Sequence, residues 1–218
     1  GFIVDSVYVQ VIPSPVVNFG NYINFCFGDS AILDAGNTGS TYLWSTGEIN
    51  QSIIVSSSGL YYVFVDNICG FASGIVNVNE ISQPIVNLGN DTTICLGDSV
   101  FLDAQNAGLS VLWSSGDTIQ TMYASPSTPT IYSVFVDNFG CSGTDSIFIT
   151  PLPNPDVYLG EDTTVCEKDS IFLDAENPGA TYLWSDGSTN QTLIIMPDSA
   201  MTVFVDVSYS DCVDSDTF

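Results

Sequence analysis

The sequence predicts an all-β protein in which small sandwich domains follow one another along the chain. Three observations support this prediction. Cysteine and tryptophan recur with a fixed period, the runs between them are short and rich in β-branched and aromatic residues, and no segment shows a sustained helical period. Each period is long enough to bury a core of its own, so we expect tandem domains instead of one large domain.

The tryptophans define the period. Trp44 and Trp113 are 69 residues apart (113 − 44 = 69), and Trp113 and Trp184 are 71 apart (184 − 113 = 71). Each follows a cysteine by 18 residues (44 − 26 = 18), and a second cysteine comes later in each unit. We expect residues 1–14 to be the last strand and linker of a preceding or neighbouring-subunit domain, followed by repeat 1 (15–83), repeat 2 (84–153) and repeat 3 (154–218, with an incomplete final strand), which begin at or next to Pro15, Pro84 and Pro155.

The elements of repeat 2 show how each unit is built. Leu88 and Gly89 are expected to end the first strand, and the Asp91-Thr92 pair to shape a turn. The Gly-Asp-Ser sequence at 97–99 then turns the chain into a strand over 100–104. Later strands are expected in the runs TYLWS (41–45 and 181–185), SIFLDA (170–175), YYVFVDN (61–67) and YSVFVDN (132–138). Roughly seven short strands per repeat, with a core tryptophan between two cysteines, predict immunoglobulin-like β-sandwich domains in an extended array.

The cysteines predict disulfides and an extracellular setting. Each repeat has two, so we expect one bridge at one end of each sandwich, with free thiols or metal ligands as the alternative. The predicted pairs are Cys26–Cys69, Cys95–Cys141 and Cys166–Cys212.

Charge and composition exclude several functions. The chain carries one basic side chain, Lys168, against 25 acidic residues, which argues against nucleic-acid binding, and no apolar run is long enough to insert into a membrane. It has no histidine, so Ser-His-Asp triads, Cys-His pairs and histidine-ligated zinc are excluded. Acidic residues that recur in every unit indicate surface positions, and we predict that the protein is not an enzyme and has no cofactor.

The polar loops have two candidate roles, calcium binding and the attachment of covalent glycans. Calcium takes six to eight oxygen ligands, so it could bind at domain junctions, although turn chemistry alone explains most of these carboxylates. The candidate calcium ligands are Asp91, Asp98, Asp103, Asp162, Asp169 and Asp174.

Covalent glycans are the second candidate. The triplet Asp-Ser/Thr-apolar (or Thr) resembles the O-glycosylation sequon of Bacteroidota, although a turn that enters an apolar strand creates the same triplet. The candidate acceptors are Ser6, Ser30, Thr92, Ser99, Thr118, Ser146, Thr163, Ser170 and Ser199.

The combined pattern LGxDTTxCxxxDSxxLDA, YLWSxG and VFVDxxxC resembles the Ig-like repeats of very large Bacteroidota cell-surface proteins, including gliding-motility adhesins and type IX secretion substrates. The resemblance implies a secreted surface stalk, filament or adhesin. The alternative is an array of carbohydrate-binding modules in a secreted protein. Surface glycans or substrata are further candidate partners.

The N-terminal residues align with a final strand. Residues 1–12 match the run from Cys141 to Leu152, whereas the run that starts at Cys212 stops at Phe218. Two explanations are open: a piece cut from a longer array, or a head-to-tail polymer in which Ile3 to Ile12 completes the third repeat of the next subunit.

Overall fold

The computed structural model describes residues 5–218, and in this range all regular structure is β. Strands β1 to β17 form six sheets, one four-stranded and one two-stranded in each of repeats 1 and 2, and one three-stranded and one two-stranded in repeat 3. The all-β prediction is therefore confirmed. Residues 1–4, which include the start of the expected Ile3–Ile12 strand, lie outside the described residues.

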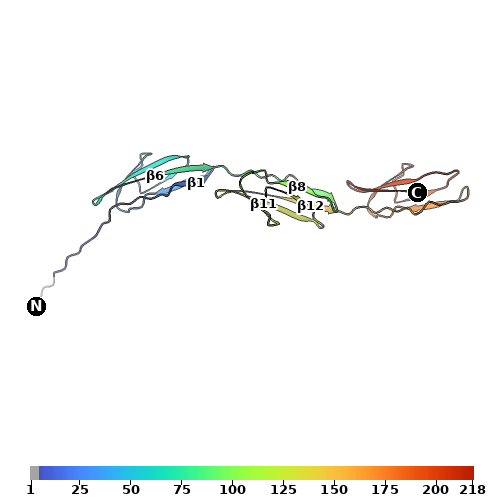
Figure 1. Ribbon diagram of the computed structural model, residues 1–218, viewed down its shortest axis with the longest axis horizontal. Helices are drawn as coiled ribbons and strands as arrows, with labels where there is room; N and C mark the ends of the chain where they lie inside the picture. Colours follow the sequence, from blue (N-terminus) through green and yellow to red (C-terminus); the bar gives the residue numbers. More distant parts are fainter. Residues whose placement is uncertain (1–4) are drawn as a thin grey trace. The chain divides into compact units, whose positions relative to one another are not determined.

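Repeat 1 has six strands. The larger sheet has the order β1-β6-β5-β3, and the smaller pairs β2 with β4. The β1 strand runs parallel to the end of β6, and the other pairs are antiparallel. Figure 1 shows β1 beside β6. The bounds are β1 Tyr22–Cys26, β2 Ala31–Asp34, β3 Thr41–Trp44, β4 Ser52–Val55, β5 Gly59–Asn67 and β6 Gly70–Ile81.

Repeat 2 follows the same plan, and repeat 3 follows it without a described counterpart of β1. Repeat 2 has the sheets β7-β12-β11-β9 and β10-β8, and repeat 3 has β14-β16-β17 and β13-β15. The bounds in repeat 2 are β7 Thr92–Cys95, β8 Val100–Asp103, β9 Ser110–Trp113, β10 Thr121–Ala124, β11 Thr130–Asn138 and β12 Cys141–Leu152. Those in repeat 3 are β13 Ile171–Asp174, β14 Thr181–Trp184, β15 Thr192–Ile195, β16 Phe204–Tyr209 and β17 Cys212–Thr217.

Alternation along the strands builds a sandwich core. In β5, Tyr61, Val63 and Val65 are buried, whereas the intervening Tyr62 and Phe64 are exposed, as the two-residue period of a half-buried strand requires. Buried residues of both sheets form one cluster around Trp44. Repeat 3 has an equivalent cluster around Trp184.

By proximity in space, the chain forms two compact units. The first comprises residues 1–85 with 136–143, and the second comprises residues 86–135 with 144–218. The first unit thus joins repeat 1 to the turn between β11 and β12, and the second contains the remainder of repeat 2 with repeat 3.

The predicted first strand of each sandwich does not form. Leu88 and Gly89, expected to end it, lie outside any strand, which leaves six strands in repeat 2 instead of roughly seven. Side-chain carboxylates replace the backbone ladder here: Leu88 N–H donates to Asp145 Oδ2 of β12 at 2.7 Å, and Phe148 N–H of β12 donates to Oδ1 of Asp91, in the loop before β7, at 2.9 Å. Side chains therefore satisfy backbone groups that a strand would have paired.

In repeat 1, the matching segment before β1 is held by close packing against β6. Gly74 lies in β6 beneath this segment, and a Cβ added there would lie 2.3 Å from Val17 Cγ1 and 2.9 Å from Phe19 Cε2. Asp145 and Asp216 occupy the matching positions in the other repeats (145 − 74 = 71 and 216 − 145 = 71).

Substitution of Gly74 should test this close approach. Gly74→Ala should lower the free energy of unfolding by about 1–3 kcal/mol, because the added methyl overpacks against Val17. The matched control is Gly59→Ala, whose Cβ would meet its nearest neighbour at an ordinary 3.7 Å. Urea denaturation of both variants measures the difference, and equal midpoints would contradict the close-packing account.

Candidate functional site

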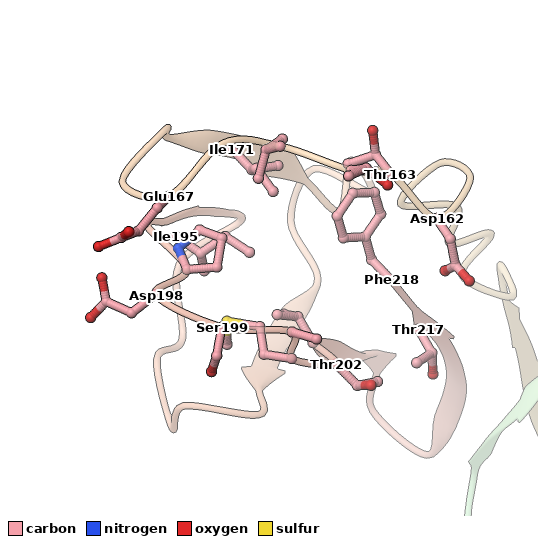
Figure 2. Close-up of a pocket in the computed structure, with 16 residues that line it drawn as sticks. Asp162, Thr163, Glu167, Ile171, Ile195, Asp198, Ser199, Thr202, Thr217 and Phe218 are labelled. Atoms are coloured by element: carbon pink, nitrogen blue, oxygen red, sulfur yellow. The ribbon is translucent and has the colours of Figure 1, made fainter.

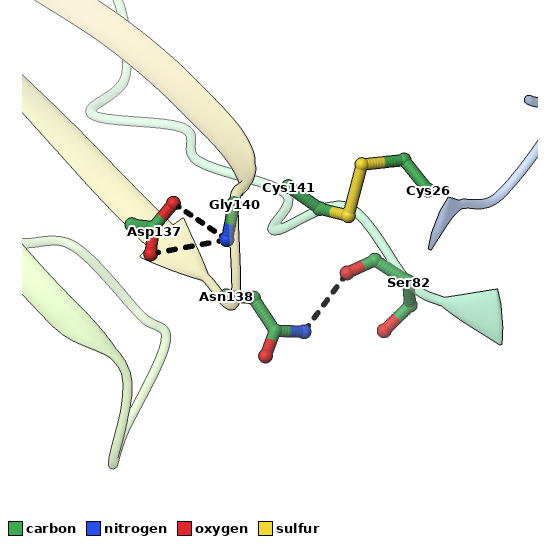
Figure 3. The surroundings of a disulfide bond; sticks show 6 residues. All are labelled: Cys26, Ser82, Asp137, Asn138, Gly140 and Cys141. Atoms are coloured by element: carbon green, nitrogen blue, oxygen red, sulfur yellow. Dashed lines mark hydrogen bonds between the residues drawn. A yellow bond between two sulfur atoms is a disulfide. The ribbon is translucent and has the colours of Figure 1, made fainter. Parts of the chain in front are cut away.

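The most distinctive chemical feature of the chain is a pair of disulfides that connect consecutive repeats. Cys26 of repeat 1 bonds to Cys141 of repeat 2, and Cys95 of repeat 2 bonds to Cys212 of repeat 3, with sequence separations of 115 and 117. Figure 3 shows the first bridge. The predicted pairing within each repeat was wrong: none of the bonds Cys26–Cys69, Cys95–Cys141 and Cys166–Cys212 forms, and Cys69 and Cys166 are free thiols.

Strand direction explains the correction. The first cysteine of repeat 1 ends β1 and lies opposite Ile81, the last residue of β6, because these two strands are parallel. The second cysteine, Cys69, lies beside Gly70, where β6 begins. Eleven residue steps along β6 separate the two ends by about 36 Å. A disulfide needs Cα atoms within about 7 Å, so the two cysteines of one repeat cannot reach each other.

The partner cysteine of the first bridge, Cys141, begins β12 directly after the turn that follows β11. Asn138, the last residue of β11, donates from Nδ2 to the carbonyl of Ser82, in the linker that follows β6, at 2.9 Å (Figure 3). The same contact recurs at the start of repeat 1, where Asn67 Nδ2 donates to the carbonyl of Pro13 at 3.0 Å. The bridge thus forms where a turn of one repeat holds the linker that precedes that repeat.

Each bridge closes a long loop. In the chain-entropy account, closing a loop of about 100 residues stabilises the folded state by about 4–5 kcal/mol. The buried partner of each bond, Cys141 or Cys212, is 2% or 3% exposed. Disulfides persist in oxidising surroundings, so the bonded cysteines indicate an extracellular or otherwise oxidising environment.

The recurring aspartates of the Leu-Asp-Ala sequence close turns. Asp103 Oδ1 accepts from Gln105 N–H at 2.7 Å and from Gln120 Nε2 at 2.9 Å. Asp34 and Asp174 accept the same kind of amide pair. The glutamine follows its aspartate by 17 residues in every repeat (51 − 34 = 17), a spacing that the sequence interpretation overlooked and that could have revealed the contact.

These hydrogen bonds also lower the pKa of two of the aspartates. Hydrogen bonds from Gln120 and Gln105 hold the pKa of Asp103 below its ordinary 3.8. Bonds from Gln51 and Gly36 lower the pKa of Asp34 in the same way.

The structure does not bring the candidate calcium ligands together. Within residues 5–218, no group of three or more histidine, cysteine, aspartate or glutamate side chains could hold a metal ion. Asp91 and Asp103 bond to amides as described above, and Asp174 repeats the role of Asp103. Asp98, Asp162 and Asp169 are exposed.

The candidate glycan acceptors are mostly accessible. Thr92 is half-buried in β7, and the remaining eight are exposed: Ser6, Ser30, Ser99, Thr118, Ser146, Thr163, Ser170 and Ser199. The three tryptophans, in contrast, are at most 2% exposed, and each indole N–H donates to a backbone carbonyl. They therefore cannot act as surface platforms for a ligand.

Repeat 3 contains a groove beside the end of β17, where the sequence analysis expected an incomplete final strand. It has a volume of about 600 Å³ and lies between the segment Thr163–Val165, the loop Pro197–Val203 and the end of the chain at Phe218. Figure 2 shows Thr163 and Phe218 at one end of the groove and Glu167 and Asp198 at the other. The first two repeats have a strand in the matching place, because the end of β6 lies beside β1 and the end of β12 beside β7.

Comparison with solved structures identifies the fold. A three-Ig fragment of titin carrying a Glu-to-Ala mutation aligns with a TM-score of 0.53 and 13% identity, covering 90% of this chain and 93% of the fragment. A titin I-band fragment of the same domains aligns with a TM-score of 0.50 and 14% identity over the same shares. The chain is therefore an array of tandem immunoglobulin-like β-sandwich domains, and the predicted fold class is confirmed.

The other comparisons add no family. No family model matches the sequence, and no curated protein matches it. Residues 5–218 contain no helix long and apolar enough to cross a membrane.

Thiol mapping tests the cysteine connectivity. Alkylation of the monomeric, unreduced 218-residue chain should modify Cys69 and Cys166, and peptic digestion should yield the Cys26 peptide joined to the Cys141 peptide. Mass spectrometry of the digest before and after reduction provides the control. A Cys26 peptide joined to Cys69 would contradict the structure.

Acid titration tests the turn aspartates. The pKa of Asp103 is lower in the folded state, so its carboxylate stabilises the fold above the ordinary value of 3.8, and this contribution is lost as the pH falls through the lower folded value. Asp103→Asn should therefore destabilise the protein at about pH 7 and have little effect near pH 2. Asp198→Asn, at an exposed loop position, is the control. A destabilisation of Asp103→Asn that does not change with pH in urea titrations would contradict this role.

Proposed function

We propose that the protein is an extracellular structural and adhesive protein without enzymatic activity. Its repeats build a cell-surface stalk or filament of the Bacteroidota type. The observation that carries the proposal is the disulfide connection between consecutive repeats. A bridge within one domain stabilises only that domain, whereas a bridge between domains also restricts the linker. Such a connection suits a protein that must keep its domains joined under load and in contact with proteases.

The surface fits the same role. The net charge of −24 keeps separate molecules apart and favours solubility outside the cell. Exposed serine and threonine acceptors are compatible with O-glycans, which would add bulk at many points of the chain. We propose that several of the Asp-Ser/Thr triplets carry such glycans and that export uses the type IX system, as in the surface proteins that the sequence resembles.

A carbohydrate-binding array is the second candidate. Phe101 and Tyr123 form an exposed aromatic pair on β8 and β10, with ring centroids 5.3 Å apart. Exposed aromatic rings are a typical platform for sugar binding. Binding to a polysaccharide panel that is lost in a Phe101→Ala, Tyr123→Ala variant would favour this function over a purely structural one.

The cellular location of the protein tests the proposal that it is a surface protein. An antibody raised against the 218-residue chain should label intact cells, and brief protease treatment of those cells should remove the label. Labelling only after permeabilisation would contradict a surface protein. A cytoplasmic protein in the same cells should resist the protease and serves as the control.

Extension under force tests the role of the bridges. The shortest covalent path between Cys26 and Cys212 runs over the 69 residues to Cys95 (95 − 26 = 69) and through the second bridge, against 186 residues after reduction (212 − 26 = 186). At about 3.4 Å per residue, the fully stretched lengths are roughly 230 Å and roughly 630 Å. Single-molecule pulling with and without a reductant measures both, and equal lengths would contradict the bridging role.

A further inference from the structure

The groove of repeat 3 lies where the sheets of repeats 1 and 2 have a strand. In repeat 1, the end of β6 lies between two neighbours, since Tyr22–Cys26 pairs with its Asn77–Ile81 on one side and Gly59 pairs with Val78 on the other. In repeat 3, Phe218 still pairs with Val203 through two backbone hydrogen bonds of 2.7 and 2.8 Å. Beyond that pair, no strand of the described range 5–218 lies beside residues 163–166, and every residue of 161–170 is exposed.

The walls of this groove suit an amphipathic β-strand. Ile171, Ile195, Val203 and Phe218 provide apolar surface. Residues 163–166 provide a strand-like edge, because the matching segment Thr92–Cys95 in repeat 2 is β7 and pairs with β12. A segment that enters the groove would therefore gain both backbone hydrogen bonds and a buried face, as in strand addition to an open sheet edge.

Residues 8–12 of the chain have the side chains that the groove requires. In repeats 1 and 2, apolar side chains follow one spacing: Val78 and Ile149 are fully buried, and Ile81 and Leu152 follow three residues later. Val9 and Ile12 have the same spacing, and a proline follows three residues later at 15, 84 and 155. Val9 is 76% exposed in the free chain, so it gains burial on docking. Val7 matches Phe218 and stays outside the sheet.

The register follows from the formed repeats. Thr92 pairs with Ile149 and Cys95 with Leu152, so Thr163 would pair with Val9, and Cys166 with Ile12. Within the chain that donates the strand, the Cys69 thiol already donates to the carbonyl of Ile12 at 3.1 Å. Docking therefore brings both free thiols to the same residue, Ile12.

We propose that a second copy of this chain is the occupant: its residues 8–12 complete the sheet of repeat 3, and its Cys69 forms a disulfide with Cys166. This inference rests on the proposed filament function and specifies how consecutive copies join. The new bond repeats the pattern of the two that are formed, since each joins the first cysteine of one repeat to the second cysteine of the next. The 218-residue chain contains both the donor segment and the acceptor groove, and a contact of this kind between copies propagates head to tail.

The covalent step needs an oxidant. We assign this role to a low-molecular-weight disulfide such as oxidised glutathione. Cys166 thiolate attacks it to form a mixed disulfide and releases one small thiol, and Cys69 thiolate then attacks the Cys166 sulfur and releases the second. Overall, the two protein thiols are oxidised to one disulfide, and the small disulfide is reduced to two thiols. The net charge of −24 per copy opposes association, so added salt should accelerate the reaction.

A complementary pair of variants tests the join. Monomeric, unreduced 218-residue chain is incubated with oxidised glutathione and separated on a non-reducing gel, where a ladder in steps of 23.3 kDa is expected. Cys69→Ser and Cys166→Ser should each stay monomeric when alone. An equimolar mixture should stop at a dimer whose digest joins Cys69 of one variant to Cys166 of the other. Monomers only, or Cys69–Cys69 and Cys166–Cys166 links, would overturn the proposal.

A second pair of variants tests the strand. Val9→Asp should reduce the dimer yield of the mixture by about tenfold or more, because it places a charge at a buried position of the sheet. Tyr8→Asp adds the same charge at a position whose equivalents, Asn77 and Phe148, are exposed, and should have little effect. Both residues are exposed in the free chain, so neither change should unfold it. Equal yields from the two variants would overturn strand docking.

Material from cells identifies the occupant. Unreduced digests of native protein should contain the Cys69–Cys166 peptide pair with both peptides from this sequence. A Cys166 peptide joined to a different repeat sequence would show that another repeat occupies the groove and would overturn the second-copy assignment. Surface labelling of intact cells is independent of this result, so a failure of the join is distinguishable from a failure of the surface function.

Discussion

The connectivity of the chain depends on one constraint, the parallel pairing of a short early strand with the far end of the last strand of its own sheet. In repeat 1 this is the pairing of β1 with the end of β6, and in repeat 2 that of β7 with the end of β12. The pairing fixes the first cysteine of a repeat at the end where the chain leaves that repeat. The second cysteine lies at the end where the chain enters. Disulfides therefore join consecutive repeats across each linker, and these covalent connections recur with the period of the sequence repeat.

Much of the fold follows from local sequence pattern. The period of the tryptophans and the two-residue alternation in runs such as Tyr61 to Val65 were sufficient to predict tandem sandwiches, because both depend on short-range chemistry. The cysteine pairing could not be predicted in the same way. It depends on which strands are neighbours and whether they run parallel, and a single sequence does not record that choice.

The strand that was expected before each first cysteine shows a related limit. Apolar residues such as Val86 and Leu88 fit a strand pattern, yet carboxylates hold this segment: Asp145 accepts from Leu88 N–H, and in repeat 3 Asp214 and Asp216 accept from Val157 and Leu159 N–H. A neighbouring strand and a set of side-chain carboxylates can satisfy the same backbone N–H donors. The strand propensity of the sequence therefore cannot distinguish the two arrangements. Asp145 also belongs to the triplet Asp145-Ser146-Ile147 that suggested a glycan, so its hydrogen bond to the backbone accounts for part of that pattern.

Because each disulfide joins two consecutive repeats, the stability of one repeat depends on its neighbours. Repeat 2 contributes Cys95 and Cys141, and these bond to different neighbours, so it has no bridge of its own. If its sandwich opened, the segment between the two cysteines would remain tied at both ends to folded neighbours. Its unfolded ensemble is thereby restricted, although no bond links the two ends directly. The stability of each repeat is consequently coupled to that of the repeats on either side. An array with this coupling gains resistance to opening at its interior repeats and is weakest where a cysteine lacks its partner.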